Sequence, residues 1–99
     1  VATVAAVLAE VVRGRAADAS VFAALRRERV HVHPVDTRTA VRAGQLLGAA
    51  RRRSEVAVDA FVVAAADLGG GAVIATVDAD DMSMLASHAR NVAVVSIQP

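Results

Sequence analysis

Five acidic side chains lie inside or directly after apolar runs of the sequence: Glu10, Asp59, Asp78, Asp80 and Asp81. An ionised carboxylate in apolar surroundings loses hydration, at a cost of several kcal/mol, unless it is paired, hydrogen-bonded or bound to a cation. Carboxylate oxygens are the ligands that Mg²⁺ and Mn²⁺ prefer in proteins. The pattern therefore predicts a site for a hard divalent cation.

Some of these acids also have a simpler interpretation. Glu10 lies three residues before Arg13, so an ion pair at the edge of a helix would satisfy it. Asp78 or Asp80 can be the N-cap of a short helix that begins near Asp81, where the helix dipole favours negative charge. Capping explains only one aspartate, and a cation site would explain why the other acids are grouped with it.

Other chemistries fit the sequence less well. A calcium EF-hand loop would need an oxygen ligand at Met82, and the phospho-acceptor α/β folds rely on a lysine, which this chain lacks. The triple glycine at 69–71 has no following Gly-Lys-Ser/Thr, so it indicates a helix stop rather than a phosphate loop. His31 and His33 lie on the same side of a predicted strand and could bind zinc, but two histidines without a third ligand are more often ordinary strand residues.

Alternating helical and strand patterns surround these acids. An alanine-rich helix is expected at 4–14 with Gly14 as its stop, and Asp36 or Thr37 is expected to cap a helix whose residues Val41 and Leu46 face inward. The full prediction is helix at 4–14, 19–28, 39–52, 56–68 and 81–87, and strand at 30–36, 72–76 and 92–97. Continuous Val/Ile runs indicate strands covered on both faces, hence an α/β fold with a central parallel sheet.

Composition limits the organisation of the chain. With 99 residues and 56% hydrophobic content, one core and a single domain, 1–99, are expected. The absence of cysteine favours a reducing compartment, and no apolar run approaches the roughly 18 residues of a membrane span. We therefore expect a cytoplasmic protein that does not enter a membrane.

The charges divide between the two halves of the chain. Ten arginines face three acids between residues 13 and 53, a net charge of +7, whereas one arginine faces six acids from residue 54 onward, a net charge of −5. Arginine suits bidentate contacts with phosphate, although the lack of lysine also fits GC-rich codon usage. The first half is thus a candidate for contacts with nucleic acid.

Three segments in order resemble one protein family. The segments VLAEVVRG at 7–14, VDAFVVAAA at 58–66 and IATVDADDM at 74–82, followed by a closing VAVVSI strand, resemble the PIN-domain ribonucleases of the VapC toxin type. The resemblance covers most of the chain. It implies a three-layer sandwich around the parallel sheet, an Mg²⁺- or Mn²⁺-dependent endoribonuclease activity, and an antitoxin from the same operon as partner.

The resemblance also implies roles for particular residues. Glu10, Asp59 and Asp78 match three of the family's catalytic, metal-binding acids, Asp81 matches a position that is often acidic and assists, and Thr76 matches the small polar residue before the last acid. The family's first strand, with its first aspartate, has no counterpart, since Val1 lies only nine residues before Glu10. We therefore expect an N-terminally truncated PIN-like domain.

The expected mechanism uses one or two Mg²⁺ or Mn²⁺ ions to activate a water and to stabilise charge on the scissile phosphate. The arginines that could hold the RNA backbone are Arg13, Arg15, Arg51, Arg52 and Arg53. Each of them can equally belong to a solvated charged surface.

The alternative function is a non-catalytic interaction module, which binds the antitoxin or a second copy of the chain without cutting RNA. A chain of 99 residues can hardly bury 56% hydrophobic content by itself, so a homodimer is expected in either case.

Overall fold

The computed structural model describes residues 2–77 and 79–97. Asp78 therefore lies outside the described residues. Within them the chain has an α/β fold of five α-helices and short strands that pair in parallel. Its internal packing divides it into two compact units, Val1–Val35 and Asp36–Pro99, called unit 1 and unit 2 below.

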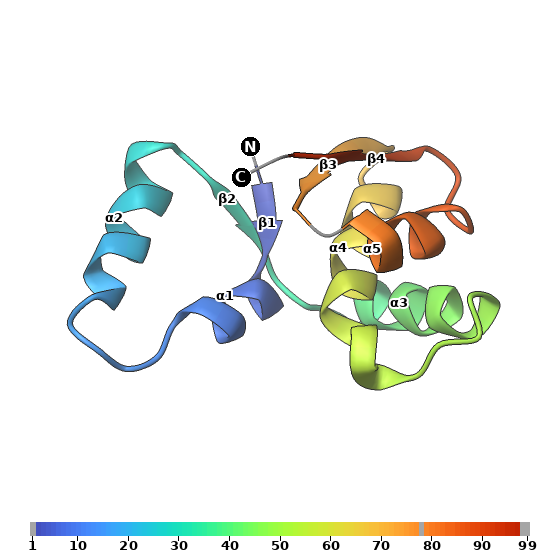
Figure 1. Ribbon diagram of the computed structural model, residues 1–99, viewed down its shortest axis with the longest axis horizontal. Helices are drawn as coiled ribbons and strands as arrows, with labels where there is room; N and C mark the ends of the chain where they lie inside the picture. The colour runs from blue at the N-terminus through green and yellow to red at the C-terminus, as the bar shows by residue number, and fades with distance from the viewer. Residues whose placement is uncertain (1, 78, 98–99) are drawn as a thin grey trace. The chain divides into compact units, whose positions relative to one another are not determined.

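Unit 1 contains two strands and two helices (Figure 1). They are β1 (Ala2–Val4), α1 (Ala5–Val11), α2 (Asp18–Arg27) and β2 (His31–His33). The strands pair in parallel, with Ala2 opposite His31 and Val4 opposite His33. The predicted helix at 4–14 is thus too long, because its first residue belongs to β1 and the chain leaves the helix at Val12.

The loop between α1 and α2 folds around one carboxylate. Asp18 accepts hydrogen bonds from the backbone N–H groups of Arg13 (3.0 Å), Gly14 (2.7 Å) and Arg15 (3.0 Å). Gly14 has φ +74°, a conformation that costs glycine little, so it is the turn of this loop and not the stop of α1. These hydrogen bonds, led by the one from Arg13, lower the pKa of Asp18.

Unit 2 runs through helix, helix, strand, helix and strand. Its elements are α3 (Thr37–Ala49), the short 3-10 turn η1 (Ser54–Val56), α4 (Ala57–Leu68), β3 (Ala72–Thr76), α5 (Ala79–Ala86) and β4 (Val92–Ser96). Asp36, one of the two N-caps that the sequence offered, is the N-cap of α3 and accepts a hydrogen bond from the Thr39 N–H at 2.8 Å, and the helix begins two residues earlier than predicted. The strand predicted at 72–76 is confirmed.

Within the described part of unit 2, helices cover one face of the β3–β4 sheet. The strands pair in parallel, with Ile74 opposite Val94, and α3, α4 and α5 lie on one side of them (Figure 1). Ile74 is buried on this side, whereas Val73 and Val95, which alternate with the covered residues, are 69% and 47% exposed. Within unit 2 the described elements cover one face of this sheet, and cover on its second face stays a prediction, because uniform apolar runs in a sequence do not reveal which face has a partner.

The core of unit 2 lies between the helices and the sheet. Leu46 of α3, Val63 of α4 and Leu85 of α5 are fully buried, and each stabilises the fold by about 1.5–3 kcal/mol. Val41, predicted to face inward, is 55% exposed, and the small Ala43 takes the buried place on that face of α3. No helix in the described part of the chain is long and apolar enough to cross a membrane.

Candidate functional site

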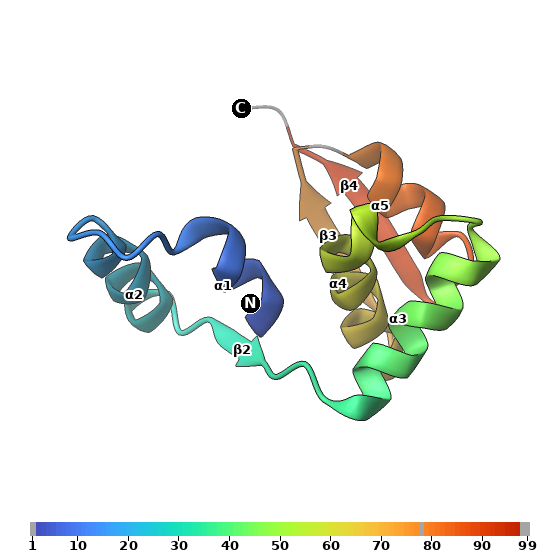
Figure 2. The ribbon, with the colours of Figure 1, turned by 90° about the horizontal axis from the view of Figure 1, so that it is seen from below.

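Those predicted acids of unit 2 that the structure describes, Asp59, Asp80 and Asp81, come from α4 and α5. A three-residue turn, 69–71, joins α4 to β3, so the two elements run in opposite directions and the start of α4 lies at the end where β3 finishes (Figure 2). Asp59, in the first turn of α4, is half-buried. Thr76 is the last residue of β3, and the chain then leads toward the acids of α5.

The sharp turn between α4 and β3 depends on glycine. Gly70 and Gly71 have φ values of +96° and +108°, which residues other than glycine rarely adopt. A Cβ atom at Gly71 would also clash with Asn91. The glycines therefore fix the antiparallel arrangement that brings Asp59 to the carboxyl end of β3. We call the end of unit 2 that holds Asp59, the carboxyl end of β3 and the first turn of α5 the acidic end.

Helix α5 adds two acids and an arginine contact to the acidic end. Asp80 and Asp81 lie in its first turn, where the helix dipole favours negative charge. Asp81 forms an ion pair with Arg52 (Oδ1 to Nη2, 3.2 Å), and both side chains are about one third exposed. Arg52 also places its Nε 3.2 Å from the Sδ of Met84, so it lies along the first two turns of α5.

Glu10 has different surroundings from those expected. It is exposed in the last turn of α1, within unit 1, so the burial cost inferred from its apolar neighbours does not apply. The alternative of a Glu10–Arg13 pair is not seen either, because the Arg13 guanidinium donates to the carbonyl oxygens of Ala9 and Val12, both at 3.0 Å.

The described residues do not complete a metal site by themselves. Within 2–77 and 79–97, no three His, Asp or Glu side chains gather so that they could hold an ion. Asp59 and Asp81 have the oxygen donors that suit Mg²⁺, yet Asp81 is engaged by Arg52. The rings of His31 and His33 lie edge to face, 4.3 Å apart, without a third ligand among these residues, so the zinc alternative gains no support.

The predicted RNA-binding arginines fall into two groups. Arg13 and Arg15 lie in the loop of unit 1 that surrounds Asp18, and both are exposed. Arg51 and Arg53 are exposed on either side of the anchored Arg52, in the segment that leads to α4. These three arginines of unit 2 thus flank the acidic end.

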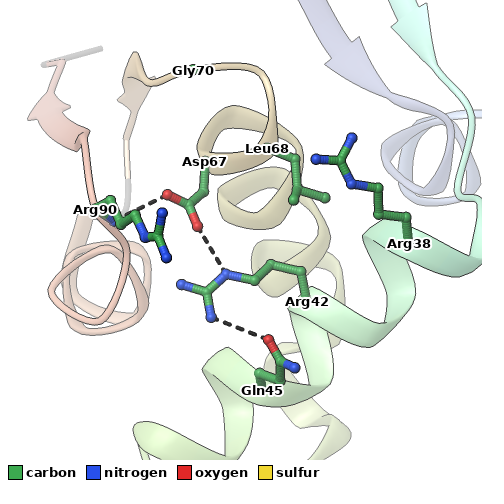
Figure 3. A pocket seen from close by; sticks show the side chains of 7 residues that line it. All are labelled: Arg38, Arg42, Gln45, Asp67, Leu68, Gly70 and Arg90. Carbon is green, nitrogen blue, oxygen red and sulfur yellow. Dashed lines mark hydrogen bonds and ion pairs between the residues drawn. The ribbon is translucent and has the colours of Figure 1, made fainter.

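A second aspartate of α4, Asp67, was not singled out in the sequence and is held by two hydrogen bonds. The Asp67 side chain is only 7% exposed, and it accepts from Arg42 Nε at 2.8 Å and from the Arg90 backbone N–H at 3.0 Å (Figure 3). The Arg90 N–H, and next the Arg42 guanidinium, lower the pKa of Asp67. The reasoning used for Asp59, an acid inside an apolar helix, would also have selected Asp67.

Comparison of the chain with protein-family models, with curated proteins and with solved structures gives no match. The proposals below therefore depend on the placement of side chains and on the order of the three sequence segments.

Proposed function

We propose that this protein is an Mg²⁺- or Mn²⁺-dependent endoribonuclease of the PIN type and acts as the toxin of a cytoplasmic toxin–antitoxin system. The observation that carries the proposal is the meeting of Asp59 with the carboxyl end of β3, from which the chain runs directly into the acidic segment at 78–81. Open α/β sheets place their sites at the carboxyl ends of strands. The order of the three family-like segments supports the same assignment.

Asp59 and Asp78 of unit 2 are the proposed ligands of the cation, with assistance from Asp81, and the proposed role of Glu10 rests on the sequence resemblance alone. When bound, such a cation supplies an activated water and offsets the negative charge of the scissile phosphate. The described geometry adds a role for Arg52, whose ion pair at 3.2 Å restrains Asp81 at the start of α5. Asp81 is therefore proposed to assist the ligands of the cation by orienting neighbouring groups, and not to be sufficient as a ligand by itself.

The arginines next to the acidic end are proposed to hold the RNA backbone. Arg51 and Arg53 are exposed and flank Arg52, so their guanidinium groups are accessible to phosphates. Bidentate contacts of this kind position a strand without reading its sequence. Arg13 and Arg15 of unit 1 are proposed to add further phosphate contacts.

The exposed face of the β3–β4 sheet favours the alternative function, a protein-interaction module. Val73 of β3 and Val95 of β4 are 69% and 47% exposed, and the exposed Val77 and Ile97 follow directly after these two strands. In the proposed three-layer sandwich another layer covers this face. In the alternative, the antitoxin or a second copy of the chain covers it, and the chain does not cleave RNA.

A cleavage assay tests the proposal. A fluorescent RNA is incubated with the protein, expressed with any residues encoded upstream of Val1, in Mg²⁺ or in EDTA. We expect cleavage in Mg²⁺, none in EDTA, and recovery when Mn²⁺ is added in excess. Cleavage that persists in EDTA would rule out the metal-dependent mechanism. Absence of cleavage, together with a stable dimer in sedimentation, would favour the interaction module.

A further inference from the structure

The end of α4 opposite the acidic end carries a polar pocket of about 430 Å³ (Figure 3). It lies within unit 2, between α3, the last turn of α4 and the segment that joins α5 to β4. Asp59 and Asp67 are eight residues apart on α4, so the pocket lies about 12 Å from the acidic end along the helix axis. The volume is in the range of sites for small molecules, at about 300–1,000 Å³.

Three arginines line this pocket: Arg38, Arg42 and Arg90. The Asp67 carboxylate, also in the lining, offsets one of their charges, which leaves a net charge of +2 among the lining residues. The remaining lining residues are uncharged and include the backbone of Gly70, which has no side chain to fill the space. The pocket is therefore suited to an anion.

Arg42 is fixed in place by the protein. Its Nε donates to Asp67 at 2.8 Å, its Nη2 to the carbonyl oxygen of His88 at 3.2 Å, and its Nη1 lies 3.4 Å from Gln45 Oε1. Three of its five N–H groups are thus used, and the side chain is only 23% exposed. Arg42 ties α3 to α4 and to the segment after α5, and so forms the rigid floor of the pocket.

Arg38 and Arg90 differ from Arg42. Among the described residues, neither guanidinium group donates a hydrogen bond or forms an ion pair, although the backbone N–H of Arg90 is held by Asp67. The anchored backbone sets the position of Arg90, and α3 sets that of Arg38. Arg38 and Arg90 therefore line one pocket with a rigid floor, and their guanidinium donors are not engaged by other described residues.

We propose that this pocket binds the phosphate monoester of a nucleotide-sized ligand, with Arg38 and Arg90 as the phosphate-binding side chains and Arg42 as a positioning residue. A phosphate monoester carries a charge of about −1.5 to −2 at neutral pH, which matches the charge of the pocket. Its oxygens suit the bidentate geometry of guanidinium groups. The ligand is either a free nucleotide or the 5′-phosphate end of an RNA, and the site is independent of the metal chemistry proposed for the acidic end.

Calorimetric titration with AMP tests this proposal, with adenosine as the ligand that lacks only the phosphate. The buffer is neutral, of low ionic strength and contains EDTA, so that no cation at the acidic end contributes to binding. We expect AMP to bind and adenosine not to bind. Equal binding of the two, or no binding of AMP, would overturn the proposal.

Two double variants locate the site. The Arg38→Gln, Arg90→Gln variant keeps the Arg90 backbone N–H bond to Asp67 and is expected to weaken AMP binding at least about tenfold, the effect of losing about 1.4 kcal/mol. The Arg26→Gln, Arg29→Gln variant removes the same charge from exposed positions of unit 1 and should bind AMP like the unmodified protein. Equal losses in both variants would show a non-specific charge effect and contradict the proposal, as would unchanged binding in the first.

Two further measurements complete the test. Circular dichroism and urea unfolding check the fold of the pocket variant, and Arg38→Gln alone, which removes no hydrogen bond of the described chain, is the second variant if the double one is unstable. RNAs of one sequence with a 5′-phosphate or a 5′-hydroxyl identify the source of the phosphate. Preference for the phosphorylated RNA over AMP assigns the pocket to RNA ends, and the reverse assigns it to free nucleotides.

Discussion

Asp59 and Asp67 lie on the same helix, and the two ends of that helix have different characters. Asp67, in the last turn of α4, is bound by Arg42 and by the Arg90 backbone, and these contacts connect three segments of unit 2. Asp59, in the first turn, lies where β3 ends and further acids follow. The two acids have similar sequence surroundings, so only their neighbours in space distinguish them.

The largest expected effect is a loss of RNA cleavage when Asp59, but not Asp67, is replaced. Asp59→Asn should lower Mg²⁺-dependent RNA cleavage at least about a hundredfold, because changes outside the ligand sphere of a metal already cost about 10–100-fold. The variant should still unfold cooperatively, since asparagine keeps the shape of the side chain. Cleavage rates under single-turnover conditions measure the effect. Asp67→Asn is the matched control on the same helix and should cleave RNA like the unmodified protein.

The next largest effect is a loss of stability when Asp67 is replaced. Asp67→Ala should lower the free energy of unfolding by about 2–3 kcal/mol, because it leaves Arg42, a largely buried cation, without its carboxylate. Urea unfolding followed by circular dichroism measures the change. If Asp67→Ala were as stable as the unmodified protein, the Arg42–Asp67 network would not have the structural role assigned to it.

The pH dependence of stability sharpens the comparison further. The pKa of Asp67 is lowered in the folded protein, so its carboxylate binds a proton less readily there than in the unfolded chain, where the pKa is about 3.9. The stabilisation is therefore present above about pH 4 and is lost as the pH falls through the folded pKa. The difference in urea midpoint between the unmodified protein and Asp67→Asn should shrink below about pH 4.

Asp18 and Asp36 also contribute to the pH dependence of stability, and their contributions must be distinguished from that of Asp67. Their pKa values are also lowered, chiefly by the N–H groups of Arg13 and Thr39, so they lose stabilisation in the same direction on acidification. Both are present in the unmodified protein and in Asp67→Asn, so their contributions cancel in the difference. A difference that stays constant from neutral to acidic pH would argue against a charged Asp67 as the source.

The smallest effect is expected at the acidic end. Arg52→Gln should change the free energy of unfolding by no more than about 1 kcal/mol, since its ion pair with Asp81 is partly exposed and pairs of this kind contribute about 0–1 kcal/mol. The same variant should reduce RNA cleavage if Arg52 orients Asp81. Unfolding and cleavage measured on one preparation distinguish these two roles, and unchanged cleavage would limit Arg52 to a surface contact.

Local signals predicted most of unit 2. The alanine-rich run before three glycines predicted α4 and its end, and Asp36 predicted the start of α3, because caps and stops depend on neighbours in sequence. The open face of the β3–β4 sheet was not predictable in this way. Val73 and Ile74 have nearly the same chemistry, and only the position of the helices decides which of them is buried.

The structure of unit 1 and the pocket in unit 2 were harder to predict, because both depend on contacts between residues far apart in the sequence. The strand β1 was not predicted, and its last residue, Val4, was assigned to a helix, because β1 pairs with β2 about thirty positions later and no local pattern shows this. Asp67 contacts Arg42 and Arg90, which are 25 and 23 residues away. Such partners can be paired with confidence only when the fold is known, so the sequence identified acids worth testing without telling structural from functional ones.

The most direct test of the difference between the two ends of α4 is a titration with Mn²⁺ followed by NMR. A bound Mn²⁺ ion broadens the signals of nearby backbone amides, and the ends of α4 are far enough apart to be distinguished. We predict that broadening at low Mn²⁺ concentration is strongest at Asp59, Thr76 and Asp81 and is lost in Asp59→Asn. Broadening centred on Asp67 and Arg90, or no site-specific broadening, would contradict the assignment of the acidic end as the cation site.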